Sequence, residues 1–253
     1  KPGIKGIMVP TMWHGFPAYG TDHYDRVWAA CADTGLVVHT HSGEADFDSY
    51  GANVAMYISE VPFWTHRILW QLLFSGKFDK YPNLRYAVVE CGSYWVGDLL
   101  WKADVNFGAS WKVKKMGSRM KGLISRLPSE YFGTNVFIGA TTMSVEEIRR
   151  RHTNGIDALM WGTDYPHPEG SWPKTVERLE NDFREVSIED TRRLLGFNAV
   201  ECYGLDLGGL TKVAERVGPT PEDLNQDPNL RTPHDATQAA RWWLDEYGCE
   251  LKY

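Results

Sequence analysis

The sequence has little of what marks a membrane, secreted or nucleic-acid-binding protein. It contains no apolar run of about 18 residues, and its first residues lack the long apolar core and cleavage site of a signal peptide. Lysine and arginine together number 27 against 33 aspartates and glutamates, so the net charge is −6 and the positive charges are scattered. We therefore expect a cytoplasmic protein that neither enters a membrane nor binds nucleic acid.

Cysteine is also scarce, and its spacing excludes common motifs. The closest two of the four cysteines, Cys202 and Cys249, lie 249 − 202 = 47 positions apart. A Cys-x-x-Cys zinc pair and a framework of short disulfide loops are therefore both absent.

What the sequence does contain is typical of one globular domain with a short appendage. Of its 253 residues, 43% are hydrophobic and 24% charged. Eleven Trp, twelve Tyr and ten Phe make the chain rich in aromatic residues. Such a content is consistent with a thick core, with a large pocket for an apolar substrate, or with both.

Five short runs rich in β-branched and apolar residues alternate with longer segments of helical periodicity, which predicts an α/β protein with a parallel sheet. Each run carries little charge, as expected of strands buried on both faces. The predicted strands are 4–9, 36–41, 85–90, 135–140 and 158–164. The predicted helices are 24–34, 64–74, 144–152, 174–183 and 187–203, followed by a short one opening at 220 and an amphipathic one over 236–247.

Polar residues close several of these strands, and the C-terminal ends of parallel strands form the active-site edge of α/β folds. His39 and His41 lie two positions apart at the end of the second run, so both imidazoles can point to one face and share a metal. A buried histidine pair bonded to loop carbonyls explains them equally well.

Glu90 and Asp164 close the third and fifth runs. Taken alone, Glu90 favours an ion pair with a nearby arginine, because a buried carboxylate is costly without a partner. Asp164 stands in Gly-Thr-Asp-Tyr-Pro-His, where it can bind a metal or accept a proton from bound water, or simply cap a loop. Together, His41, Glu90 and Asp164 form a ligand set suited to Zn, Mn or Fe(II).

Three segments make the sequence recognisable: the run from His41 through 72–85, the run 162–167, and Gly-Phe-Asn-Ala at 196–199. They resemble the amidohydrolase-2 family, which includes aminocarboxymuconate-semialdehyde decarboxylase and related hydrolases, over about residues 3 to 205. The resemblance implies a metal-dependent TIM (β/α)8 barrel. It makes His41 the metal ligand of the fifth barrel strand, and Asp164 the aspartate of the eighth that contacts metal and moves protons.

The chain departs from the family at two places. Glu90 stands where many relatives have a histidine, in an E-x-G-x-x-W pattern ending at Trp95, and a carboxylate there can bridge one metal ion or two. The match begins only at the fourth barrel strand. The family's first three strands, with their His-x-His metal pair, are therefore expected from a second polypeptide or from an N-terminal segment outside this sequence.

The resemblance divides the chain into two parts and suggests a reaction. Residues 1–206 are expected to form the C-terminal portion of the barrel, and 207–253 a helical tail packing on the barrel or on a neighbour in a homo- or hetero-oligomer. The expected activity is metal-dependent hydrolysis of a small carbonyl substrate, namely an amide, ester, lactone or thioester of a bulky apolar or aromatic acid. Decarboxylation is the first alternative, and a non-catalytic barrel subunit or binding module the second.

Four further residues are candidate substrate contacts. They are His14, His39, Trp95 and His167. For each a purely structural role competes, namely a surface histidine for His14, a buried one for His39, core packing for Trp95 and loop structure for His167.

Overall fold

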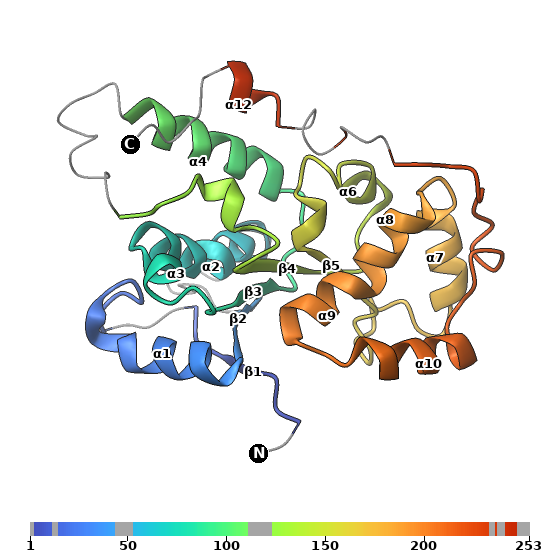
Figure 1. Cartoon of the computed structure of the whole chain (residues 1–253), viewed down its shortest axis with the longest axis horizontal. Helices are drawn as coiled ribbons and strands as arrows, with labels where there is room; N and C mark the ends of the chain where they lie inside the picture. The colour runs from blue at the N-terminus through green and yellow to red at the C-terminus, as the bar shows by residue number, and fades with distance from the viewer. Residues whose placement is uncertain are drawn as a thin grey trace.

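The protein is described by a computed structural model that covers residues 3–11, 15–43, 53–110, 123–232, 236 and 241–246. Five parallel strands form one sheet in the order β1-β2-β3-β4-β5, so each strand pairs with its neighbour in sequence (Figure 1). The predicted parallel α/β architecture is thus confirmed. The strands are β1 (Gly6–Met8), β2 (Val37–His41), β3 (Tyr86–Val89), β4 (Val136–Thr141) and β5 (Leu159–Gly162).

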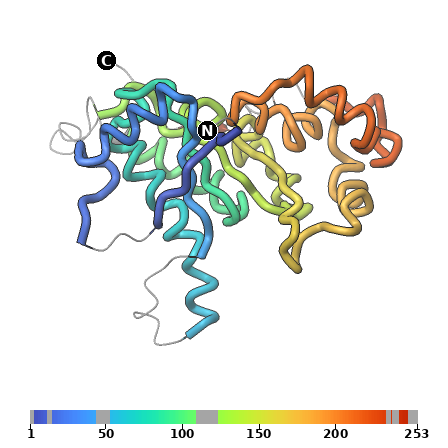
Figure 2. Tube along the Cα trace, turned by 90° about the horizontal axis from the view of Figure 1, so that it is seen from below, coloured from blue at the N-terminus to red at the C-terminus, as the bar shows by residue number. Residues whose placement is uncertain are grey.

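Helices connect these strands and continue beyond the last, and the orange part of the chain after β5 lies to one side of the trace in Figure 2. Those between strands are η1 (Asp22–Tyr24), α1 (Asp25–Thr34), α2 (Val54–Phe74), α3 (Lys77–Lys80), α4 (Val96–Ser110), η3 (Pro128–Tyr131), α6 (Val145–Arg149) and η4 (Ile156–Ala158). After β5 come α7 (Thr175–Phe183), α8 (Ile188–Arg192), η5 (Arg193–Phe197), α9 (Asn198–Tyr203), α10 (Leu207–Val217) and α12 (Trp243–Glu246).

The helix predictions were partly wrong. Helix α2 begins at Val54 rather than at residue 64, because Asn53 caps it by accepting a hydrogen bond from the Met56 N–H at 3.1 Å. Helices α4 and α10 were not predicted. The short helix expected at residue 220 is a turn, in which Thr220 and Asp223 bond each other and Asn225 has φ of 50°. The positive φ of Asn225 interrupts helical geometry after one turn.

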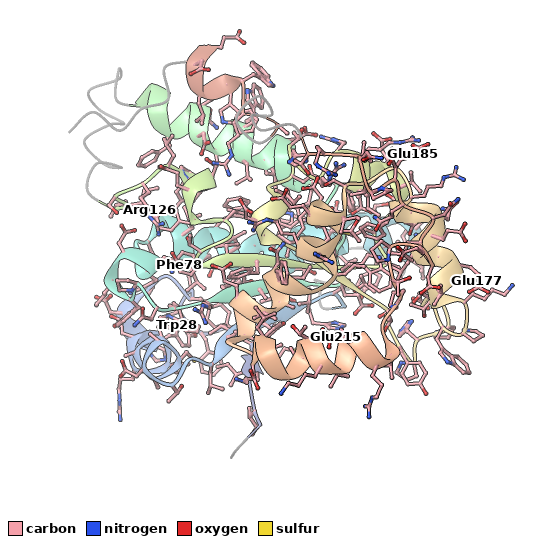
Figure 3. The ribbon with its side chains drawn as sticks, turned by 45° about the vertical axis from the view of Figure 1, so that its right-hand side comes forward. Trp28, Phe78, Arg126, Glu177, Glu185 and Glu215 are labelled. Carbon is pink, nitrogen blue, oxygen red and sulfur yellow. The ribbon has the colours of Figure 1, made fainter. Side chains whose placement is uncertain are left out.

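The main core lies between the sheet and the helices on its outer face. Val38, Tyr86 and Ile138 point from successive strands into this layer. They belong to one cluster with Trp28 of α1 and Phe78 of α3, which are both buried, whereas Glu177 of α7 and Glu215 of α10 are exposed (all four are labelled in Figure 3). This outer layer supplies most of the buried apolar surface that holds the strands in place.

A smaller core covers the inner face of the sheet at the N-terminal end of the strands. Val37, Ala87, Phe137 and Met160, from four different strands, pack there against Cys202 of α9. Polar bonds reinforce this contact, and the Lys5 ammonium, just before β1, donates to the Gly204 carbonyl at 3.0 Å. Helix α9 therefore closes the end of the sheet opposite to the predicted active-site edge.

Part of the C-terminal tail packs on the protein's own α4. Trp243 is buried, and its indole N–H donates to the Asp104 carboxylate at 2.9 Å. Burial raises the pKa of Asp104, although bonds from Trp243 and Ser129 act in the opposite direction. Helix α10, by contrast, has no buried residue. The division of the chain at residue 206 stays a prediction.

Two remaining expectations concern membranes and cysteines. None of the helices that the structure describes is both long and apolar enough to cross a membrane. Within the described residues, Cys31, Cys91 and Cys202 are buried free thiols. Cys249 lies outside the described residues.

Candidate active site

The polar residues singled out in the sequence gather at the C-terminal edge of the sheet. His41 is the last residue of β2 and pairs in register with Val89 of β3, so Glu90 comes directly after its neighbour. Asp164 follows β5 by two residues. Because all five strands are parallel, these ends lie along one edge, where connecting loops carry catalytic groups in barrel enzymes.

His41 and Glu90 are in direct contact. The His41 Nε2 atom forms an ion pair with Glu90 Oε2, and His41 Nδ1 lies against the carbonyl of Ser42. Their side chains remain 44% and 29% exposed. An imidazole nitrogen and a carboxylate oxygen thus lie next to each other at an open edge, so the predicted arginine partner for Glu90 is replaced by a histidine.

Asp164 lies in a second group, with His167 and Glu169. The Nδ1 atom of His167 is 3.8 Å from Asp164 Oδ2 and 2.5 Å from Glu169 Oε2. Ligand atoms of all three residues lie within 4.8 Å of one another, a separation that allows one cation to reach them all. The hydrogen bond to Glu169 raises the pKa of His167, and the charges of Asp164 and Glu90 act in the same direction.

The predicted metal set is therefore distributed over two adjoining groups. His41 contacts Glu90, while Asp164 contacts His167. Both groups lie at the C-terminal edge of the same parallel sheet, one at the ends of β2 and β3 and the other after β5. Binding of one ion by His41, Glu90 and Asp164 together stays a prediction.

Backbone strain is concentrated at the same edge. Glu90, Thr142 and Asp164, which follow β3, β4 and β5, have φ of 55°, 38° and 59°. Residues other than glycine rarely adopt this left-handed region, aspartate somewhat more often than glutamate or threonine, and such outliers are frequent at functional sites. At each of these three strand ends, the left-handed backbone therefore points the side chain in a direction that an extended backbone would not give it.

Glu147 braces the loop that carries Glu90, a role that sequence reasoning missed. It forms the predicted capping box with Ser144, whose N–H and hydroxyl both donate to its carboxylate at 2.9 Å. It also accepts from the Ser93 N–H at 2.5 Å and hydroxyl at 3.0 Å. Burial alone raises the pKa of Glu147, but these bonds lower it overall, so the group stays ionised. The link to Ser93 has no local sequence signal.

His39 makes the contacts of a structural histidine. Its Nδ1 lies 3.1 Å from the Ile7 carbonyl, and its Nε2 lies 2.9 Å from the Tyr203 hydroxyl. The ring also stacks on Tyr203, with centroids 5.6 Å apart. Burial lowers the pKa of His39, which keeps it neutral near pH 7. Its predicted substrate contact stays a prediction beside these observed bonds.

Trp95 likewise makes contacts within the protein interior. It is buried, its indole N–H donates to the Cys91 carbonyl at 3.1 Å, and it stacks on His66 at 4.2 Å. Burial lowers the pKa of His66 to about 4, so this histidine is neutral. Trp95 therefore supports the loop that begins at Glu90, and its proposed substrate contact stays a prediction. His14 lies outside the described residues.

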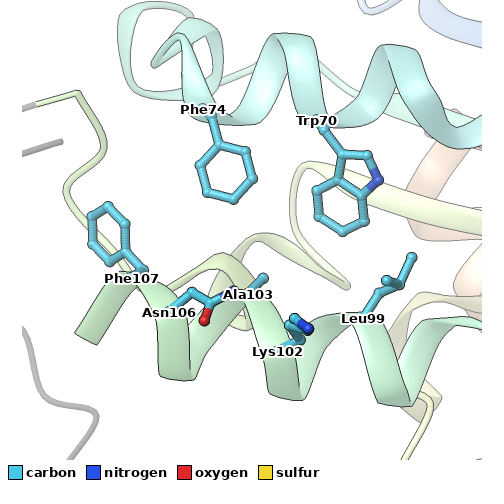
Figure 4. A pocket seen from close by; sticks show the side chains of 7 residues that line it. All are labelled: Trp70, Phe74, Leu99, Lys102, Ala103, Asn106 and Phe107. Atoms are coloured by element: carbon cyan, nitrogen blue, oxygen red, sulfur yellow. The ribbon is translucent and has the colours of Figure 1, made fainter. Parts of the chain in front are cut away.

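A cavity of about 320 Å³ lies elsewhere, between α2 and α4 (Figure 4). Trp70 and Phe74 point into it from α2, and Leu99, Ala103 and Phe107 from α4. These helices belong to the outer layer of the sheet, so the cavity is separate from the strand ends. Its position gives it no part in the site described above.

Parallel strands followed by helices, with polar groups at the C-terminal strand ends, define the class of α/β barrel proteins. The chain belongs to the amidohydrolase family, whose model, described as "Amidohydrolase", matches residues 1–205. This confirms the resemblance and its extent. No protein of curated function matches the chain.

Solved structures support the same fold. A 5-carboxyvanillate decarboxylase from Sphingomonas paucimobilis is 19% identical with a TM-score of 0.63, over 80% of this chain and 59% of that one. An amidohydrolase from Mycobacterium avium subsp. paratuberculosis is 22% identical with a TM-score of 0.62, over 80% and 52%. A 5-carboxyvanillate decarboxylase from Novosphingobium aromaticivorans, complexed with manganese and 4-hydroxy-3-methoxy-5-nitrobenzoic acid, is 20% identical with a TM-score of 0.63, over 79% and 56%.

These likenesses establish the fold and its extent. The chain spans between 52% and 59% of the length of the three structures. Its five described strands correspond to part of an eight-stranded barrel, with β1 and β5 as the two edges. The expected fold, a partial TIM barrel, is thus confirmed.

Proposed function

We propose that this chain forms the C-terminal part of a divalent-metal-dependent enzyme that acts at a carboxyl or carbonyl carbon. The observation that carries the proposal is the set of polar groups at one edge of the sheet: the His41–Glu90 pair and Asp164 with His167. Strained backbone at Glu90 and Asp164 supports a functional rather than a structural reason for this arrangement.

The residues present fit a divalent cation. Imidazole nitrogen and carboxylate oxygen are donors that suit Mn, Zn or Fe(II), and His41 and Glu90 already bring one of each together. His41, Glu90 and Asp164 would hold one ion, or two if Glu90 bridges them. When bound, the metal supplies Lewis-acid polarisation of a substrate oxygen. Manganese in a solved relative of the fold agrees with this choice of cofactor.

The remaining steps fall to the chain's own side chains. Asp164 is the group that accepts or returns a proton at the reacting carbon or at water. His167 lies 3.8 Å from it and, with its pKa raised, is positioned to hold a proton and to orient an anionic substrate. Glu147 keeps the loop of Glu90 in place through Ser93.

Decarboxylation of an aromatic acid is the first candidate reaction, because two of the relatives described above are named decarboxylases. Hydrolysis of an amide, ester, lactone or thioester is the second candidate, supported by the family description and by the amidohydrolase of similar fold. Both reactions need the same residues, since each requires a polarised oxygen and one proton transfer.

Metal binding and product analysis test the proposal together. We expect manganese to bind in calorimetry, Asp164→Asn to weaken its binding, and the exposed control Asp98→Asn to leave it unchanged. Carboxylate substrates labelled with ¹³C should release labelled CO₂ if the reaction is decarboxylation, whereas incorporation of ¹⁸O from water indicates hydrolysis. Binding of small molecules without metal affinity or turnover would instead favour a non-catalytic barrel subunit.

We further propose that three more βα units complete the barrel around β1 and β5. They would come from a second polypeptide or from a preceding segment and carry the family's His-x-His pair. Mass spectrometry of the natively purified protein under denaturing conditions tests this, because three βα units need on the order of 100 residues. A folded, metal-binding and active chain of 28.8 kDa alone would contradict it.

A further inference from the structure

The loop between β5 and α7 carries two large aromatic side chains that contribute little to the core. Tyr165 is 65% exposed and Trp172 is 68% exposed. Neither belongs to either hydrophobic core cluster. Aromatic side chains gain stability mainly through burial, and no packing within the described residues accounts for the exposure of these two rings. We name this pair the aromatic corner.

The two rings of the aromatic corner stand nearly at right angles. Their centroids are 5.7 Å apart and their planes cross at 73°. In this edge-to-face geometry, the face of one ring and the face of the other form the two walls of an open angle. A third aromatic ring can stack on one of them and meet the edge of the other, which are the two arrangements that aromatic pairs prefer.

The loop holds the corner in a defined conformation. The Ser171 N–H donates to the Thr163 carbonyl at 2.9 Å, and the Tyr165 N–H donates to the Thr163 hydroxyl at 3.3 Å, so both ends of the loop are tied to one residue. Gly170 fills the centre, where a Cβ atom would lie 2.8 to 3.0 Å from three backbone carbonyl oxygens. The exposure of the two rings is therefore built into a closely packed loop.

The corner also adjoins the candidate active site. Tyr165 directly follows Asp164, and His167 on the same loop reaches Asp164. From this geometry we propose that Tyr165 and Trp172 determine specificity by binding the aromatic ring of a planar carboxylic acid. The proposal rests on the proposed function, in which the carboxyl end of the substrate meets the polar groups of the strand ends.

A protein partner is the competing occupant of the corner. The residues around the two rings argue for a small molecule, because His167, Glu169 and Lys174 are exposed next to them. Charged residues are depleted at the centres of protein interfaces, whereas a few polar groups beside an aromatic wall are typical of ligand sites.

Paired ligands of matched shape and charge test the proposal. The dissociation constants of 4-hydroxybenzoate and of 4-hydroxycyclohexanecarboxylate are measured on the full chain by calorimetry, with and without manganese. We expect the aromatic acid to bind more tightly, and Trp172→Ala or Tyr165→Ala to reduce that preference by about threefold to tenfold. Trp172→Phe should retain most of it. Phe197→Ala, which removes a 47% exposed ring on η5, should not change it.

Each other result overturns the proposal. It fails if the native chain binds neither acid, if both acids weaken equally in the two alanine variants, or if the variants change nothing. It also fails if Trp172→Ala abolishes self-association in sedimentation velocity, since the corner is then a protein interface. Failure of the proposed function is a separate result, namely a manganese affinity that does not depend on Asp164. The two failures can be told apart because the ratio of the two dissociation constants is also measured without metal.

Discussion

The two ends of the same five strands are built on different principles. At the N-terminal end, α9 covers the inner face, Cys202 is buried, and the Asn198 amide donates to the Ile156 and Leu159 carbonyls at 2.7 and 2.6 Å. At the C-terminal end, His41 and Glu90 are open to solvent, and Glu90 has a left-handed backbone. The buried contacts thus lie at one end, and the groups to which we assign the chemistry lie at the other, as in barrel enzymes generally.

The largest effect is expected from Asp164→Asn at the C-terminal end. The substitution keeps the shape of the side chain but removes the carboxylate to which we assign the proton transfer, so turnover should fall by roughly 10²- to 10⁴-fold. Thermal unfolding should change little, since the side chain has no buried partner to lose. Steady-state kinetics and calorimetric unfolding on the same preparation check both parts. A large loss of stability with preserved turnover would contradict the assignment of chemistry to the C-terminal end.

Asn198→Ala at the N-terminal end should have the opposite signature. Asn198 is fully buried, and its loss leaves the Ile156 and Leu159 carbonyls without a donor. We expect the free energy of unfolding to fall by about 2 to 4 kcal/mol in urea titrations. Asn229→Ala, at an exposed position where, among the described residues, only the backbone N–H is bonded, is the matched control and should stay within about 0.5 kcal/mol. Activity per folded molecule should be unchanged, and a specific loss of kcat would argue against a purely structural N-terminal end.

Acid should weaken the protein through Asp190, a buried residue of α8. Burial alone raises the pKa of Asp190, but hydrogen bonds from His152 at 3.0 Å and Arg151 at 2.6 Å lower it to about 2. The folded state therefore binds the proton less readily than the unfolded chain. The resulting stability, roughly 2 kcal/mol, is complete above about pH 4 and is lost as the pH falls toward 2.

Asp190→Asn separates this contribution from the rest of the acid transition. Unfolding free energies measured between pH 5 and pH 2 should fall more steeply for the native chain than for the variant. Parallel curves for the two proteins would show that the ion cluster does not contribute in this range.

The smallest effects concern backbone conformation. Gly35 ends α1 with φ of 70° and open space around it, so Gly35→Ala should lower stability by about 1 kcal/mol. Thr142 has φ of 38° at the end of β4, so Thr142→Gly should raise stability by about 0.5 to 1 kcal/mol. Denaturant unfolding distinguishes the opposite signs. A loss of stability in Thr142→Gly would show that the strand end is not strained.

The strands were predictable because each is a short, continuous apolar segment with a polar residue at its end. The same pattern located His41, Glu90 and Asp164 on one edge, and the structure places each at a strand end. Helix α10 escaped prediction because two glycines, Gly208 and Gly209, which are poor helix formers, stand in its first turn. Glu169 was missed for another reason, since its contact with His167 depends on how one loop turns.

Local sequence determined the five strands, the family, and which polar residues stand at the strand ends, because the periodicity and the termini of a strand depend on a few neighbouring positions. Only the tertiary structure decided their partners. In the tertiary structure His41 contacts Glu90, and His39 bonds to Tyr203, which is 164 residues away in the chain. It also buried Trp95 against His66. Such pairings depend on loop conformation and on packing between distant segments, which no local pattern encodes.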